Sequence, residues 1–332
     1  MDHLALTIFR PEHYADLSDY SQLSKMSIPD RFVLMDHFNG FSKNGYSLVL
    51  DNLNKLASER NKLYEVYHHN VIPVTVCFKY PNLNIRSSEA WQHRYHTYHF
   101  EKYTQPANID YQNFICSFNG SPHVSRKLLV SAIKKFGYFD PGYCSKNFTY
   151  SVDNIDGHIE EYMPDKTSLY RKFFISEDSE QFFQTPNTFG HNEALRYQHT
   201  NNMHNLEDKI TNSFLHIVSE TLATSYVPYV TEKSFYSIVS KGLFLAYAQP
   251  GWHAYIEKYY GFKLYNNLFD YTFDSIVNPV ERLVELMTMV GKYSKLTTAE
   301  WHDLYLLEQD SVEFNWNHYH SGDYRKQLQS YE

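Results

Sequence analysis

Short apolar runs divide the first hundred residues into segments with the length of β-strands. Three runs rich in β-branched and aromatic residues cover 4–9, 31–38 and 71–80, and each ends near Pro, Asn or Gly. Between the last two, residues 46–67 carry leucines at roughly helical spacing, among them Leu53 and Leu56. A strand, a helix and a strand in this order predict a βαβ unit, and therefore a parallel sheet.

The rest of the chain repeats this alternation after a polar stretch at 81–110, which is the expected first domain boundary. Strands are expected at 113–118, 213–218, 243–248 and 262–265, and helices at 125–136, 231–241, 252–260, 279–292 and 301–307. Gly137, Gly242 and Gly261 each follow a predicted helix and are expected to end it. Segment 151–205 is acidic and polar, which is typical of a long loop region. The pattern predicts an α/β protein with two domains and a ligand site beside the carboxyl ends of the strands.

The composition excludes several classes of protein. Apolar residues make up 42% of the 332 residues, too many for a disordered chain, and 12 Gly are too few for a collagen-like one. No run of 18 apolar residues occurs, and the first residues lack the features of a signal peptide, so we expect a cytoplasmic protein without a membrane span. Cys77, Cys116 and Cys144 lack metal-site spacing and are expected to be reduced thiols.

The charge leaves the partner open. A net charge of −8 taken alone disfavours nucleic acid. The acidity is regional, however, because segment 111–150 carries five basic residues and one acidic residue. Lys134 and Lys135 with Arg126 and Lys127 are candidates for a patch that contacts a phosphate backbone. The alternative is that these side chains are solvated on helix faces.

The start of the predicted helix at 231–241 carries the most informative chemistry. Thr231 can cap the free N–H groups of the first turn, and Lys233 adds its charge to the partial positive charge of the helix end. Such a site suits a diphosphate, and the adjacent Glu232 can accept hydrogen bonds from a ribose. The alternative from these residues alone is an ordinary capped helix with a solvated Glu–Lys pair.

The residues around this helix resemble an enzyme family. The set consists of a strand ending in Glu220 before Tyr-Val-Thr-Glu-Lys at 229–233, a strand ending in Asn119 before Arg126, and Gly-Phe at 261–262, Tyr-Thr-Phe-Asp at 271–274 and Arg282 downstream. It resembles the donor-binding half of α1,3-fucosyltransferases, and still more the related glycosyltransferases of bacteriophages. The resemblance spans roughly 113–292. It departs from the family's pattern by one extra residue between Ser117 and Asn119.

The resemblance implies a glycosyltransferase of the GT-B type, with two Rossmann-like domains facing a cleft. It implies an N-terminal acceptor-side domain at 1–110 and a donor domain at 111–298. The tail at 299–332 is then expected to pack back on the N-terminal domain. This architecture transfers one sugar with inversion and holds no metal, and the chain shows no convincing Asp-x-Asp motif at a strand end.

The resemblance also implies the donor-site residues. Arg126 and Lys233 are expected to bind the donor diphosphate, whose charge grows as it leaves, and Glu232 to hold the ribose. Three further residues complete the expected donor site: Asn119, Glu220 and Thr231. The co-substrate is a nucleotide sugar, a UDP-sugar in preference to a GDP-sugar, and no other cofactor or metal is expected.

The catalytic base has to come from residues 1–110, which the resemblance does not cover. Inverting transfer needs a group that removes the acceptor proton. Asp36, at the end of the predicted strand at 31–38, is the candidate, and a turn aspartate that caps the next element is the alternative. Weaker candidates for the base are Glu59, Glu65 and Glu89.

The expected acceptor is hydroxymethylated cytosine in phage DNA. Aromatic residues make up 17% of the chain, and rings can stack on an extruded base. A cell-surface glycan or lipopolysaccharide is the alternative within the enzyme class. A non-catalytic nucleic-acid or carbohydrate-binding module is the alternative from another class, and it has no need of a diphosphate site.

For two histidine-rich segments, we favour a structural role over a functional one. His93, His96 and His99 recur every third residue, but a metal site needs a fourth ligand, so a polar aromatic surface is favoured. In the tail, Trp316 and Tyr319 lie near further histidines, His318 and His320, and are expected to pack into a core.

Overall fold

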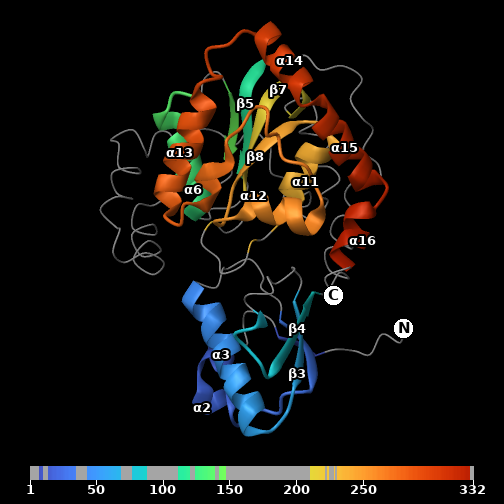
Figure 1. The fold of residues 1–332 in the computed structure, drawn as a ribbon. Coiled ribbons are helices and arrows are strands. Elements are labelled where there is room, and N and C mark those ends of the chain that lie inside the picture. Colours follow the sequence, from blue (N-terminus) through green and yellow to red (C-terminus); the bar gives the residue numbers. More distant parts are fainter. Residues whose placement is uncertain are drawn as a thin grey trace, which may run out of the picture.

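The strands form two separate parallel sheets. The computed structural model of the chain describes residues 7–9, 14–34, 43–68, 77–87, 111–119, 124–138, 142–146, 210–220, 223, 228 and 230–329. Within this part, one four-stranded sheet has the order β1-β2-β3-β4 and the other the order β6-β5-β7-β8 (Figure 1). All strand pairs are parallel. The predicted α/β class with parallel sheets is therefore confirmed.

The first sheet has its own apolar core. Its elements are β1 (Thr7–Phe9), α1 (Tyr14–Ser18), α2 (Tyr20–Leu23), β2 (Arg31–Leu34), α3 (Lys43–Glu59), β3 (Tyr64–His68) and β4 (Leu83–Ser87). Phe32 lies at the centre of this core and meets the rings of Phe9 and Tyr64 edge-on, at centroid distances of 5.3 and 6.0 Å. Helix α3 supplies the buried leucines Leu50 and Leu53.

Two predictions for this part differ from the described residues. The helix expected at 46–67 ends at Glu59, because Asn61 takes a left-handed backbone (φ 50°) and Leu63 is 58% exposed. From Tyr64 the burial alternates with the period of a strand, which becomes β3. Of the strand expected at 71–80, residues 71–76 lie outside the described residues, and 77–80 form no strand. Strand β4 lies inside the expected boundary segment 81–110.

The second sheet is buried on both faces. Its strands are β5 (Asn113–Asn119), β6 (Tyr143–Lys146), β7 (Ser213–Ser219) and β8 (Leu243–Tyr247). Its helical segments are α6 (Val124–Lys135), α11 (Glu232–Val239), α12 (Trp252–Tyr255), a π-helical turn η4 (Ile256–Tyr260), a 3₁₀ turn η5 (Tyr271–Ser275) and α13 (Pro279–Gly291). Helices α6 and α13 cover one face and α11 and α12 the other (Figure 1). Every residue of β7 and β8 is buried, which explains their continuous apolar runs.

Most elements expected in this half are present, with three differences. Strand β6 was not predicted, and residues 262–265 form no strand. Gly137 and Gly261 take left-handed backbones at helix ends, as predicted, but after α11 it is Lys241 (φ 54°) that does so. At Gly242, glycine is required for another reason: a neighbouring side chain lies too close to leave room for a Cβ atom.

Among the described residues, the tail packs on the second sheet, whereas packing on the first was expected. It consists of α14 (Thr298–Leu307), α15 (Gln309–His320) and α16 (Asp323–Gln329). The indole of Trp301 stacks on Phe114 of β5 and Phe214 of β7, at 5.8 and 5.9 Å. Tyr319 packs against Phe235 of α11 at 5.5 Å, and the buried tail residues belong to the core of the second sheet. The physical reason is that the rings of the tail complete an aromatic core over β5, β7 and α11.

Candidate functional site

The carboxyl ends of β5 and β7 form the best-placed site in the described part of the chain. Strand β5 continues through α6 to β6 on one side, whereas β7 continues through α11 to β8 on the other. Two neighbouring parallel strands whose connections diverge leave a crevice at their carboxyl ends, where α/β proteins bind ligands. Asn119 ends β5 and Glu220 follows β7, so the structure brings these two predicted residues to the same edge.

Glu220 is the centre of this site. Its side chain is fully buried, and Oε1 accepts hydrogen bonds from Oγ of Ser234 at 2.6 Å and from the backbone N–H of Thr231 at 3.2 Å. Oε2 is also buried and has no hydrogen-bond partner among the described residues. Burial raises the pKa of Glu220, and the charge of Lys233 opposes that increase.

The first turn of α11 lies directly against Glu220. Thr231 is the N-cap, as predicted, and its hydroxyl accepts from the backbone N–H of Lys233 at 3.4 Å and from its Nζ at 3.2 Å. Lys233 is half-buried. Glu232 begins the helix, and its side chain lies outside the described residues. The N-terminus of α11 and the ammonium of Lys233 therefore place positive charge at this edge of the sheet.

The first turn of α6 reaches the backbone of Glu220 from the opposite face of the sheet. Oγ of Ser125 donates to the backbone carbonyl of Glu220 at 3.4 Å. Arg126 follows it and is only 4% exposed. Asn119, at the end of β5, is also buried, and its Nδ2 donates to Oγ of Ser117 at 3.1 Å. Two helix N-termini thus meet at Glu220, and their first turns carry Arg126 and Lys233, an arrangement that suits a phosphate-bearing ligand.

The four basic residues of α6 do not form one surface patch. Arg126 and Lys127 are buried in the first turn, and burial lowers the pKa of Lys127. Lys134 and Lys135 are exposed in the last turn. A helix rises about 1.5 Å per residue, so the two pairs lie at opposite ends of α6. The hypothesis of a single patch for a phosphate backbone is therefore wrong for these four residues.

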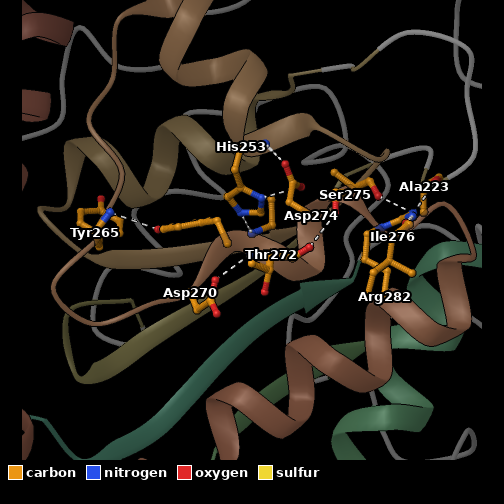
Figure 2. A network of polar contacts seen from close by, with 12 residues as sticks. Ala223, His253, Tyr265, Asp270, Thr272, Asp274, Ser275, Ile276 and Arg282 are labelled. Atoms are coloured by element: carbon orange, nitrogen blue, oxygen red, sulfur yellow. Dashed lines mark hydrogen bonds and ion pairs between the residues drawn. The ribbon is translucent and has the colours of Figure 1, made fainter.

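Arg282 holds the backbone at the edge of the site rather than facing it. Its guanidinium donates to the carbonyls of Ala223 and Ala248 at 2.8 Å each, and to those of Ile276 and Val277 (Figure 2). It is 1% exposed. Ala223 follows β7 and Ala248 follows β8, so this arginine ties together the chain that leaves both strands. The sequence resemblance includes Arg282 but does not indicate this role.

A buried His–Asp pair supports the same edge and was not predicted. Nδ1 of His253 lies 2.8 Å from Oδ1 of Asp274, and Oδ2 accepts from the His253 backbone N–H at 2.9 Å (Figure 2). Nε2 accepts from the N–H of Ala246 in β8 at 3.1 Å. The imidazole is therefore neutral, with its proton on Nδ1, and both nitrogens are used inside the fold.

The candidates for the catalytic base are only partly described. Asp36 and Glu89 lie outside the described residues, as do the three histidines at 93, 96 and 99. Glu59 accepts a hydrogen bond from the hydroxyl of Tyr20. Glu65 forms an ion pair with Arg31 at 2.6 Å. The hydrogen bond from the hydroxyl of Tyr67 and the charge of Arg31 both lower the pKa of Glu65. A lower pKa makes Glu65 a weaker base.

Metal and membrane features can be checked in the described part of the chain. No group of three His, Cys, Asp or Glu side chains there is arranged to hold a metal ion. Within the same residues, no helix has the length and apolarity needed to span a bilayer. The three cysteines are thiols outside any disulfide, and burial raises the pKa of Cys116.

A scan against protein-family models, a search of curated proteins and a search of solved structures found no significant match to this chain.

Proposed function

We propose that the chain is a metal-independent glycosyltransferase that binds a nucleotide-sugar donor at the carboxyl ends of β5 and β7. The observation that carries the proposal is the convergence of the first turns of α6 and α11 on Glu220, because these turns carry Arg126 and Lys233. In two-domain enzymes of the GT-B type, a donor diphosphate needs cations of this kind because its charge grows as the sugar leaves.

The roles follow from the chemistry of each side chain. Lys233 and Arg126 bind the diphosphate, and the N–H groups of the first turn of α11 add to them. Glu232 accepts hydrogen bonds from the ribose hydroxyls, while Asn119 and Thr231 line the site. Asp36 removes the acceptor proton, so that the sugar is transferred with inversion. A UDP-sugar is the proposed donor, in preference to a GDP-sugar.

The proposed acceptor is hydroxymethylated cytosine in DNA, with a cell-surface glycan as the alternative. Both proposed acceptors rest on the sequence resemblance. If the acceptor is DNA, the enzyme acts in the cytoplasm. The two acceptors differ in their dependence on salt. Binding to DNA weakens steeply as salt rises because counterions are released, whereas binding to a neutral glycan changes little.

A thermal-shift screen tests the donor site directly. The full chain is heated with UDP, GDP, dTDP, CMP and their common sugar conjugates. A ligand at about 100 times its dissociation constant adds about 2.7 kcal/mol, or an increase in Tm of a few degrees. Stabilisation by one nucleotide class supports the proposal and identifies the donor. No stabilisation by any of them contradicts it and favours a non-catalytic binding module.

A further inference from the structure

The two carboxyl oxygens of Glu220 have different surroundings, and the roles proposed above for the donor site do not explain this difference. Oε1 accepts two hydrogen bonds, from Thr231 N–H and Ser234 Oγ. Oε2, equally buried, accepts none from the described residues. A buried carboxylate oxygen without a donor is costly, because a charge in a medium of low dielectric needs compensation. A proton on Oε2 removes that cost and leaves both bonds to Oε1 intact.

The compensation for the ionised carboxylate comes from Lys233. It is the charged residue that acts on Glu220 and favours its ionised form. The other elements packed against Glu220 contribute polar groups: Ser125 of α6 donates to its carbonyl, and the carbonyl of Tyr247 in β8 accepts from its N–H at 3.1 Å. Two charged residues, Arg126 and Glu232, occupy the same helical turns as Ser125 and Lys233.

We propose that Glu220 takes up one proton on Oε2 when an anionic diphosphate binds to Lys233, so that donor binding and protonation of Glu220 are linked. The inference rests on the proposed function, since it needs an anionic ligand at Lys233. The physical reason is that the ligand neutralises the lysine and adds negative charge beside the carboxylate, which both favour the protonated form. The proton comes from solvent, and no covalent bond of the ligand changes.

Glu220 is then a positioning residue whose charge depends on the ligand. It holds the N-cap Thr231 and Ser234 of α11 in both protonation states, because Oε1 accepts in either state. By thermodynamic linkage, a ligand that raises the proton affinity of Glu220 binds more tightly as pH falls. The gain is limited to tenfold per pH unit for one proton.

Isothermal titration calorimetry measures this linkage. UDP-glucose and GDP-mannose are suitable probes, because their diphosphodiester groups do not titrate near neutral pH. The full chain is titrated between pH 5.5 and 8.5 in buffers of different ionisation enthalpy, which yields the number of protons taken up. We expect wild type to take up as much as one proton per bound ligand. We expect Glu220→Gln to bind the probe as well, but to take up close to no proton. Ser234→Ala, which removes a hydrogen bond but no charge, is expected to retain the uptake.

The outcomes separate this inference from the proposed function. Binding without proton uptake at any of these pH values, or equal uptake by Glu220→Gln, overturns the inference and leaves the donor site standing. No binding of either probe overturns both. If Glu220→Gln does not fold, infrared difference spectra of wild type decide the question. A protonated-carboxyl band that grows as the probe binds supports the inference, and its absence contradicts it.

Discussion

A Cβ atom on Gly242 would lie 2.5 Å from Cε1 of His216. The ring of His216, in the middle of β7, cannot move aside, because its Nε2 donates to the carbonyl of Ile210 at 2.8 Å and its Nδ1 accepts from Ser237 Oγ at 3.0 Å. The backbone of Gly242 is not left-handed. The need for glycine between α11 and β8 is therefore steric.

Gly242→Ala should destabilise the second sheet by about 1–3 kcal/mol, the usual cost of forcing an extra carbon into a packed core. Urea denaturation of the two proteins measures the difference. The same substitution in a His216→Ala background is the control, since the ring is then absent. An equal cost in both backgrounds would show that the ring is not the obstacle.

The stability of the chain should fall in acid because of His216. Burial lowers its folded pKa from 6.5 to about 4. Between these pH values the unfolded chain binds a proton that the folded chain does not, so unfolding is favoured as pH falls from 6.5 towards 4. For this shift the loss is about 3 kcal/mol.

The His216→Gln variant isolates this contribution. Glutamine can bond to Ile210 and Ser237 but does not titrate, so its free energy of unfolding should change less over the same pH range. The comparison is between the two pH slopes, because other groups, Glu220 among them, also titrate. Parallel slopes for wild type and variant would exclude His216 as the cause.

Asp274→Ala should cost about 2–5 kcal/mol, since it leaves two buried donors of His253 without an acceptor. The matched control is Asp270→Ala, four residues earlier, where the lost group is an exposed cap on the N–H of Thr272 at 2.9 Å. Removing such a cap costs about 1 kcal/mol. Thermal or urea denaturation of both variants checks the order, and similar losses would refute a special role for the His–Asp pair.

Lys233→Ala should weaken binding of the donor nucleotide by roughly 10- to 100-fold, the value of a hydrogen bond to a charged group. The fold should persist, because Lys233 is half-buried and Thr231 remains the cap. Lys134→Ala, at the exposed far end of α6, removes the same charge and is expected to bind normally. Unchanged affinity in the Lys233 variant would contradict the donor-site assignment.

Local sequence patterns were sufficient to predict a helix or strand where the buried positions follow a single period without interruption. The apolar run of β8 and the N-cap of α11 depend on neighbouring residues, and they lie where the sequence predicts. The pattern was insufficient after Glu59. There Leu63 continues the apparent helical spacing, although it is exposed and the strand β3 begins one residue later.

The residues of the candidate site were predictable, but the contacts of Glu220 were not. Thr231 and Lys233 carry a recognisable helix start, and Asn119 and Glu220 end predicted strands. The pairing of Glu220 with Ser234 depends on how α11 packs against β7, and no spacing rule indicates it. The same holds for Ser125, which reaches Glu220 from 95 residues away.

The sequence by itself determined the α/β class, the parallel sheets and the capped helix that presents Lys233, because periodicity and capping act over a few residues. Only the tertiary structure decided that the tail packs on the second sheet, that Arg282 holds the chain leaving β7 and β8, and that His253 pairs with Asp274. The last two link residues 59 and 21 positions apart. Their partners are backbone carbonyls and a single carboxylate, which become neighbours only when the chain packs into its core.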